Sequence, residues 1–481
     1  MKLTLTFTLL LGCLFPNFLC AEDSAVLDIG NRRELFVDDY LIDKMQNTRL
    51  ALHRPQDEGI AFSFDHPWEG LFAGYCTIIK DGSNYMAYYR GMPAIGHTKD
   101  NEITCIAQSK DGIHWTKPKL GLFEIRGSNK NNVILARHRA CHNFSPFLDK
   151  NPNAKKSERF KAMGGTGKPG LIAFTSPDGI HWNEVQKAPV ITKGAFDSQN
   201  VSFWSETEGC YVCFFRVFKD GFRRISRCTS DDFLHWSEPV LMEYRHRGGK
   251  APIEHLYTNQ TQPYFRAPHL YVATAARFMP GRQVLTDEQA KAINVNPKYF
   301  KDTSDAIFMT TRGGNIYERT FLSSFVRPGI GARNWVSRTN YPALNVVQTG
   351  PVEMSVYVNQ DYAQPTAHLR RYSMRLDGFA SVQAPYAGGE LLTKPLRFSG
   401  NQLKINFSTS AAGGIRVEIQ DAAGKPIPGF RLADSREQIG NEIERVVTWK
   451  AGSDLSKLAG KTVRLRFLIK DADLFAIQFA K

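Results

Sequence analysis

The chain has 481 residues and a formal net charge of +14 at pH 7. This length exceeds one ordinary globular domain, so we expect a large domain and a smaller one. The basic residues are not gathered into a Lys/Arg tract, which disfavours nucleic acid as a partner. A diffuse basic surface suits an acidic or sulfated polysaccharide, although basic proteins are also common without such a partner.

The first residues have the pattern of a secretory signal. Lys2 precedes an apolar run, and the acidic pair Glu22 and Asp23 follows it. We therefore expect a signal peptide over residues 1–21 and a secreted or periplasmic protein. The position of Cys13 leaves lipid anchoring open as an alternative. No later segment is long and apolar enough to predict a membrane span.

A seven-residue pattern recurs along the chain. Ser-Lys-Asp-Gly-Ile-His-Trp at 109–115 returns as Ser-Pro-Asp-Gly-Ile-His-Trp at 176–182 and, more loosely, as Ser-Asp-Asp-Phe-Leu-His-Trp at 230–236. Degenerate copies follow at 311–317 and 375–379. Each copy predicts the end of an outer strand and its exit turn, where Asp accepts bonds from backbone N–H groups and Gly adopts a positive φ. Five copies favour an all-β fold, a five-bladed β-propeller.

We expect the propeller to occupy residues 30–385. In its first blade, an inner strand over 72–79 turns at Asp81 and Gly82 and returns over 85–90, since Asp-Gly between two such runs is a strong hairpin signal. The other blades are expected to begin near residues 141, 196, 253 and 352.

The fourth blade carries an insertion. Thr286 and Gln289 have the spacing of a capping box, so we expect a short helix up to about residue 293.

The sequence pattern changes after Gly388 and Gly389. Strictly alternating segments, each bounded by Gly, Ser or Asp, follow at 403–407, 415–420, 446–449 and 463–469. They predict a small C-terminal β-sandwich over residues 388–481. We expect this domain to pack on the propeller, and carbohydrate binding by it stays open.

A signal peptide, five blade-like repeats and a C-terminal sandwich resemble the five-bladed glycoside hydrolases of the invertase, levansucrase and arabinanase superfamily. The segments Phe-Val-Asp-Asp-Tyr, Pro-Trp-Glu-Gly, Phe-Asp-Ser-Gln-Asn and Tyr-Phe-Arg-Ala-Pro-His are similar to those of exported bacterial proteins labelled as glycosyl hydrolases. The chain lacks the Asn-Asp-Pro-Asn-Gly and Arg-Asp-Pro signatures of invertases, so the resemblance does not fix the sugar or the catalytic residues.

The resemblance implies catalytic carboxylates where the inner strands begin, because these positions face the funnel. It would make Glu69 the base or nucleophile, Asp197 the residue that tunes a pKa and holds a sugar hydroxyl, and Glu254 the acid. Glycosidic cleavage requires a proton donor and a second carboxylate. A purely structural role is also open for each: Asp197 could cap a turn, and Glu69 could be a solvated rim residue.

Arginine, asparagine and histidine near the same positions could bind the substrate, since Arg forms bidentate bonds to carboxylate or sulfate. The candidates are Arg90, His142, Asn143, Asn200, Arg216, His255, Asn259, Arg266 and Arg312, and Glu353 at the expected start of the fifth blade is a further one. No metal or cofactor motif is present, so neither is expected. We expect an exported glycoside hydrolase acting on a polysaccharide or oligosaccharide, with a non-catalytic carbohydrate-binding propeller as the alternative.

Overall fold

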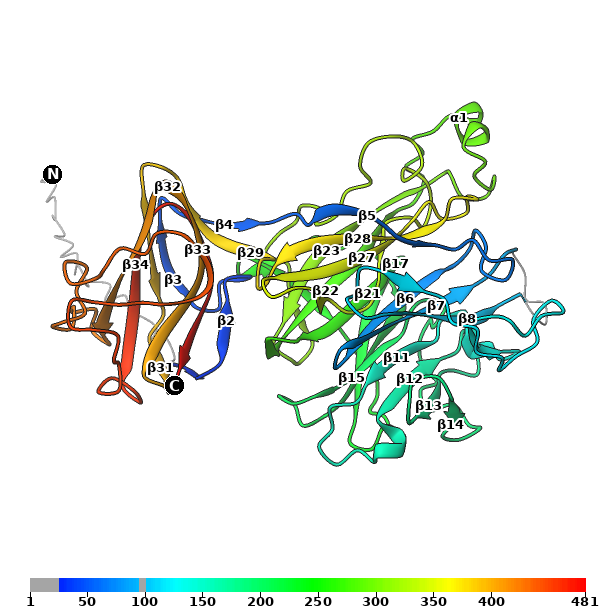
Figure 1. Ribbon diagram of the computed structural model, residues 1–481, viewed down its shortest axis with the longest axis horizontal. Helices are drawn as coiled ribbons and strands as arrows, with labels where there is room; N and C mark the ends of the chain where they lie inside the picture. Colours follow the sequence, from blue (N-terminus) through cyan, green and yellow to red (C-terminus); the bar gives the residue numbers. More distant parts are fainter. Residues whose placement is uncertain (1–25, 95–100) are drawn as a thin grey trace, which may run out of the picture.

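The structure is a computed structural model and describes residues 26–94 and 101–481. The expected signal peptide, residues 1–21, lies outside the described residues. Five β-sheets form the blades of a propeller, and a sixth sheet forms a separate module that contains the C-terminal strands (Figure 1). The all-β, five-bladed fold predicted from the repeats is therefore confirmed.

The first three blades follow the chain. The first blade contains β6 (Gly74–Asp81), β7 (Asn84–Gly91), β8 (Ile103–Ser109), β9 (Trp115–Thr116) and β10 (Val133–Ala136). The second contains β11 (Ser145–Leu148), β12 (Phe160–Gly164), β13 (Ile172–Ser176) and β14 (Asn183–Glu184). The third contains β15 (Val201–Ser205), β16 (Cys210–Lys219), β17 (Phe222–Ser230) and β18 (Val240–Leu241).

The fourth blade is the largest. It contains β19 (Glu243–His246), β20 (Gly249–Lys250), β21 (His255–Tyr264), β22 (Ala267–Met279), β23 (Thr303–Thr311) and β24 (Ile316–Glu318). The predicted insertion holds helix α1 (Asp287–Ala292), and its capping box forms between Thr286 and Gln289 as expected. Two 3-10 turns, η1 (Arg139–His142) and η2 (Lys156–Glu158), lie in the second blade's connections.

The fifth blade closes the circle with a strand from the beginning of the chain. It contains β25 (Tyr341–Pro342), β26 (Val347–Gln348), β27 (Glu353–Gln360), β28 (His368–Arg375) and β5 (Gln56–Ser63). The segment 341–348 is innermost, and a parallel bridge joins Leu344 to Thr77 of β6. The prediction that this blade begins near residue 352 was therefore wrong, because the innermost strand is short, broken, and interrupted by Pro342 and by Asn345 at φ 77°.

The sixth sheet joins both ends of the described chain. It contains β1 (Leu27–Gly30), β2 (Arg33–Leu35), β3 (Ile42–Gln46), β4 (Arg49–Leu52), β29 (Ala380–Ala384), β30 (Gly389–Thr393), β31 (Leu396–Phe398), β32 (Gln402–Asp421), β33 (Asn441–Val446) and β34 (Thr462–Ala480). Residues 27–52 thus lie beside the C-terminal strands, so the prediction that the propeller begins at residue 30 was wrong (Figure 1). The segments expected as separate strands at 403–407 and 415–420 form one strand, β32, with an irregularity between Thr409 and Gly414.

The repeated motif forms the same turn each time. Oδ1 of Asp111 accepts the backbone N–H groups of Ile113 and His114, both at 2.8 Å, and Oδ2 lies 2.7 Å from Nδ1 of His114. Trp115 returns its indole N–H to the carbonyl of Gly112 at 3.1 Å. The other two clear copies repeat these bonds around Asp178 and Asp232. The Asp of the motif is structural, as the sequence indicated, and the His beside it is bonded within the same turn.

The described cysteines form no disulfide, and five of the six are buried. No helix in the described ranges is both long and apolar enough to cross a bilayer.

Candidate functional site

A polar and aromatic recess lies where the inner strands begin. On β6, an irregular register between Gly74 and Thr77 places Tyr75 at φ 52°. Bulges of this kind re-aim side chains beside functional sites, and a positive φ at an aromatic residue is strained. The guanidinium of Arg90, from β7, stacks on the Tyr75 ring at 4.6 Å.

Asp197 lies on the loop that leads into β15. The buried amide of Asn143 shapes this loop, since its Nδ2 donates to the carbonyls of Phe196 at 2.5 Å and Ser198 at 2.7 Å. Asn200 donates to the same two carbonyls, at 3.2 and 3.0 Å. Both asparagines were expected to bind substrate, but their amide N–H groups are used within the protein. They position Asp197 instead.

Two carboxylates lie on opposite sides of His142. Nε2 of His142 is 2.9 Å from Oδ1 of Asp197, and Nδ1 is 2.9 Å from Oε1 of Glu102. The side chain of Asp197 is 57% exposed, whereas that of Glu102 is 11% exposed. The arrangement therefore offers one open carboxylate and one sheltered carboxylate, linked through an imidazole.

Cations keep Asp197 ionised. Burial would raise the pKa of Asp197, but the hydrogen bond and charge of His142, with Arg216 and Arg338, lower it to about 2. Arg216 approaches Oδ2 of Asp197 at 3.4 Å from β16. At neutral pH this carboxylate is a base or a nucleophile rather than a proton donor.

Three arginines surround the ring of Tyr257. The guanidinium carbons of Arg216, Arg223 and Arg338 lie 5.0, 5.2 and 5.4 Å from its centroid. Such stacking holds the guanidinium groups in place while leaving their N–H edges for other partners. The site is strongly cationic for a pocket that also contains Asp197.

Buried amides separate this recess from the other end of the propeller axis. Gln199 donates to Oγ1 of Thr77 at 2.8 Å, and Gln260 donates to Oε1 of Gln199 at 2.6 Å. Gln260 also donates to the carbonyl of Pro342 at 3.0 Å. These bonds connect four blades across the axis, so the funnel is closed partway.

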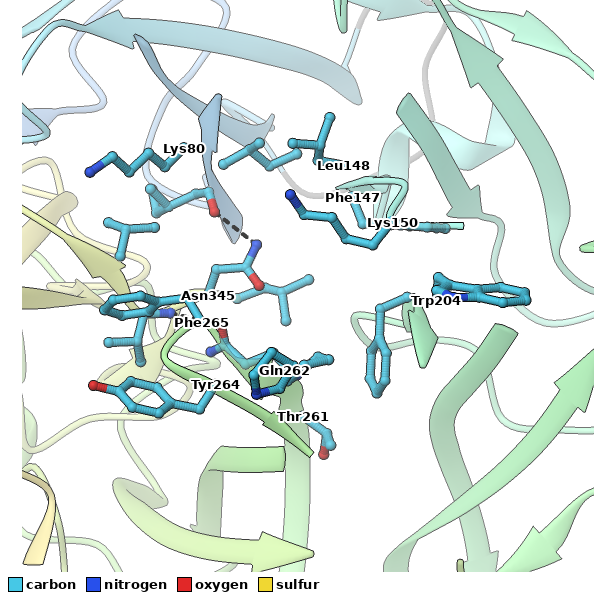
Figure 2. A pocket seen from close by; sticks show the side chains of 18 of the residues that line it. Lys80, Phe147, Leu148, Lys150, Trp204, Thr261, Gln262, Tyr264, Phe265 and Asn345 are labelled. Atoms are coloured by element: carbon cyan, nitrogen blue, oxygen red, sulfur yellow. Dashed lines mark hydrogen bonds between the residues drawn. The ribbon is translucent and has the colours of Figure 1, made fainter. Parts of the chain in front are cut away.

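A larger cavity, of about 480 Å³, lies where the inner strands end. Figure 2 shows Lys80, Lys150, Trp204, Phe265 and Asn345 around it. Glu206 is the one carboxylate among the residues that line this cavity. Acid–base cleavage by paired carboxylates therefore fits the opposite end better.

Glu69 is not at the funnel, contrary to the sequence prediction. It is fully buried, and its carboxylate binds Lys117 at 2.7 Å and the hydroxyl of Tyr89 at 2.5 Å. The backbone and side chain of Glu69 both bond to His66, which folds the carboxylate back into the blade. This closed turn makes Glu69 a structural ion-pair partner.

Glu254 is also away from the recess. It pairs with Arg277 at 3.1 Å and with Arg319, and it lines a separate groove of about 820 Å³ on the fourth blade. Its two carboxylate oxygens are taken up by the two guanidinium partners, outside the recess. The prediction that Glu254 is the catalytic acid is not supported by this placement.

Several other candidates have structural partners elsewhere. Arg266 binds Glu444 and Arg312 binds Glu34, and both glutamates belong to strands of the sixth sheet. Glu353 begins β27 and pairs with Arg371 at 3.0 Å, so it lies beside the end of the innermost strand rather than its start. The amide of Asn259 is held by Thr261 and Tyr317.

His255 lies at the margin of the arginine cluster, where its ring contacts Phe222 and accepts from the backbone of Arg223. Of the predicted residues, the structure brings Asp197, Arg90, His142 and Arg216 together.

Sequence reasoning missed the rest of the site. The missed residues are Tyr75, Glu102, Arg223, Arg338, Tyr341, Asn359 and Tyr362. Glu102 follows a long connection between two strands, and nothing local signals its direction. Tyr341 would have been found had the innermost strand of the fifth blade been placed at residues 341–348.

Within residues 26–94 and 101–481 there is no group of three or more His, Cys, Asp or Glu side chains that could hold a metal ion.

Neither a protein-family model nor a curated protein matches the sequence. The chain is similar to the solved structure of an N-acetylgalactosamine deacetylase from F. plautii in complex with blood group B trisaccharide, with 14% identity, a TM-score of 0.44, and 69% of this chain and 97% of that chain covered. It is similar to a glycosyl hydrolase from Bacteroides ovatus, with 11% identity, a TM-score of 0.38, and coverage of 72% and 93%. A structure described under the GH130 family of mannoside phosphorylases gives 11% identity, a TM-score of 0.39, and coverage of 70% and 96%.

Proposed function

We propose that this protein is a glycoside hydrolase whose reacting groups are Asp197, Glu102 and His142. The observation that supports this most is the placement of the two carboxylates on opposite sides of one imidazole. Two hydrogen bonds and the ring between them imply carboxylate oxygens roughly 7–8 Å apart, a separation like that of inverting enzymes. Because the imidazole of His142 fills the space between the two carboxylates, the sugar and its water would lie on the open side of Asp197 and His142.

The roles follow from the environment of each group. Asp197, ionised and open, takes a proton from a water molecule, whose oxygen forms the new bond to the anomeric carbon. The glycosidic bond breaks, and the leaving oxygen takes its proton from the protonated imidazole of His142, which Glu102 orients. The proton that Asp197 took from water then returns to His142 through the hydrogen bond between them. The proposed acid therefore differs from Glu254, the residue that the family resemblance implied.

The ligand would be a polysaccharide or oligosaccharide. The partly exposed ring of Tyr75 offers an aromatic surface, and Arg90 and Arg216 offer charged hydrogen-bond donors beside the carboxylates. Sugars are commonly bound by such combinations of aromatic faces and convergent polar groups. The proposal includes secretion or export to the periplasm, which rests on the signal pattern of residues 1–21.

A binding protein without catalysis is the second candidate. One specific observation favours it: Asp197 is the one predicted catalytic carboxylate that reaches the recess, and it is already bonded to His142 and Arg216. A carbohydrate-binding propeller would need the aromatic and arginine residues but no opposed carboxylates.

A screen of the purified protein against plant and marine polysaccharides, read by release of reducing ends, separates the two candidates. We expect hydrolysis of at least one polymer and a loss of about 100-fold or more in kcat for Asp197→Asn, with binding retained. Binding of a polymer with no hydrolysis by the wild-type protein would instead establish the second candidate.

A further inference from the structure

The recess beside Asp197 narrows to a small buried space. It has a volume of about 20 Å³, and its lining includes Tyr75, Arg90, Arg338, Tyr341, Asn359 and Tyr362. A space of this size holds about one water-sized group. It is therefore too small for a sugar ring and has room for about one oxygen atom of a substituent, whose other atoms would lie in the wider recess.

Polar atoms in this recess have no partner within the described protein. The hydroxyl of Tyr341 and both amide atoms of Asn359 are buried and make no hydrogen bond. Tyr341 is 7% exposed and Asn359 is 3% exposed. An unpaired buried polar group costs about 1–3 kcal/mol, so three such atoms on two residues that line one space indicate a missing hydrogen-bonding partner.

The charge of the recess is positive. Arg90 and Arg338 line it, and Arg216 keeps its Nε and Nη1 atoms buried without hydrogen-bond partners. Arg90 is 6% exposed, and its Nη2 group donates to the carbonyl of Phe72 at 2.9 Å and to the hydroxyl of Tyr362 at 3.3 Å. Buried guanidinium groups with free N–H edges favour an anion that can accept several bonds at once.

We propose that this recess binds a compact anionic substituent of the saccharide, the carboxylate of a uronic acid or a sulfate ester. Arg90 and Arg338 supply the positive charge, and Tyr341 and Asn359 donate hydrogen bonds to its oxygens. The inference rests on the proposed function only in taking the ligand to be a saccharide. It identifies the substrate class as sugars that carry an acidic group. The neutral parent sugars should therefore bind weakly.

The test compares matched sugars by isothermal titration calorimetry on the purified full-length protein. The anionic probes are D-galacturonic acid, D-glucuronic acid and D-galactose 6-sulfate, and the neutral controls are D-galactose and D-glucose. We expect at least one anionic probe to bind about tenfold or more tightly than its neutral parent, because charge-assisted hydrogen bonds are the strong ones. The uronic acid and sulfate arms identify which group fits.

Tyr341→Phe is the sharpest variant, because it removes only a hydroxyl that has no partner in the protein. Its melting temperature should be equal to that of the wild type or higher, while the preference for the anionic sugar falls at least about threefold, the loss expected for one hydrogen bond. Tyr357→Phe is the matched control, since that buried hydroxyl bonds to the carbonyl of Gly112 between two blades. It should lower the melting temperature and leave the preference unchanged.

Equal affinity for anionic and neutral sugars would overturn the inference, as would failure of all three anionic probes to bind. A preference that survives Tyr341→Phe unchanged would also overturn it, because the anion would then lie elsewhere. Hydrolysis of neutral polymers without such a preference would refute this inference and leave the proposed function standing. A clear preference in a protein that hydrolyses nothing would refute the proposed function and leave the inference standing.

Discussion

The carboxylates of Asp197 and Glu69 differ in their exposure and in their hydrogen-bonding partners. Asp197 lies at the surface of a recess with a histidine and an arginine beside it, and its side chain is 57% exposed. Glu69 is enclosed by Lys117 and Tyr89 within the first blade. The residue type and its position just before an inner strand are similar for both carboxylates. What decides whether the side chain reaches the recess is the path of the loop that precedes the strand.

Asp197 should make the free energy of unfolding depend on pH in the acidic range. Its folded-state pKa of about 2 lies below the ordinary value of 3.8, so its stabilising contribution is present above pH 3.8 and is lost as the pH falls toward 2. We expect the difference in unfolding free energy between wild type and Asp197→Asn to shrink between pH 5 and pH 2.5. Urea denaturation at several pH values measures it, and a difference that stays constant would contradict the assigned pKa.

Glu69→Gln should reduce stability. The substitution leaves the ammonium of Lys117, which is 13% exposed, without its buried partner. Breaking such a pair by removing one member costs about 3 kcal/mol. Asp65→Asn is the matched control, because Asp65 also binds Lys117 at 2.8 Å but is 69% exposed, and it should cost less than about 1 kcal/mol. Similar losses in urea unfolding for both variants would contradict this account.

At the scale of elements, local bonds account for what could be predicted. The repeated turn is built from contacts between residues two or three positions apart, so its Asp, Gly, His and Trp can be read directly from the sequence. The capping box of α1 is local in the same way. The innermost strand of the fifth blade depends instead on pairing with β27 and on a bridge to Thr77, and its own residues carry little strand pattern.

The third copy of the turn offers a controlled substitution. Asp232 accepts the backbone N–H groups of Leu234 at 2.9 Å and His235 at 2.8 Å, whereas the exposed carboxylate of its neighbour Asp231 accepts neither of these N–H groups. We expect Asp232→Ala to lower the unfolding free energy by about 1–2 kcal/mol, the typical cost of losing such a capping carboxylate. Asp231→Ala should be within about 0.5 kcal/mol of wild type. Equal effects in chemical denaturation would show that the turn does not stabilise the blade.

At the scale of the whole molecule, both ends of the described chain meet in one sheet. Strands β1 to β4 join the C-terminal strands, and β5 then closes the fifth blade. A buried ionic cluster connects this sheet to the propeller: Arg33 lies 3.2 Å and Arg266 3.1 Å from the carboxylate of Asp377. Pairings between distant parts of the chain cannot be predicted from local patterns. This is why the prediction that residues 30–52 belong to the propeller was wrong.

Asp377→Asn should destabilise the entire protein. Asp377 is fully buried and also accepts the hydroxyl of Tyr264 at 2.8 Å, so the substitution leaves two arginines partly unpaired at a cost of about 3 kcal/mol. Glu444→Gln is the control, because Glu444 binds the same two arginines but is 44% exposed, and it should cost less than about 1 kcal/mol. Differential scanning calorimetry should show one transition that moves downward as a unit. A second transition left at the wild-type temperature would contradict the coupling.

The location of the catalytic site is the central claim, and it is tested most directly by comparing kcat for four variants on one hydrolysed saccharide. The account predicts that Asp197→Asn and Glu102→Gln each lose about 100-fold or more, while Glu254→Gln and folded Glu69→Gln stay within about threefold of wild type. Full activity in Asp197→Asn together with loss in Glu254→Gln or folded Glu69→Gln would contradict it and return catalysis to the carboxylates that the structure places elsewhere.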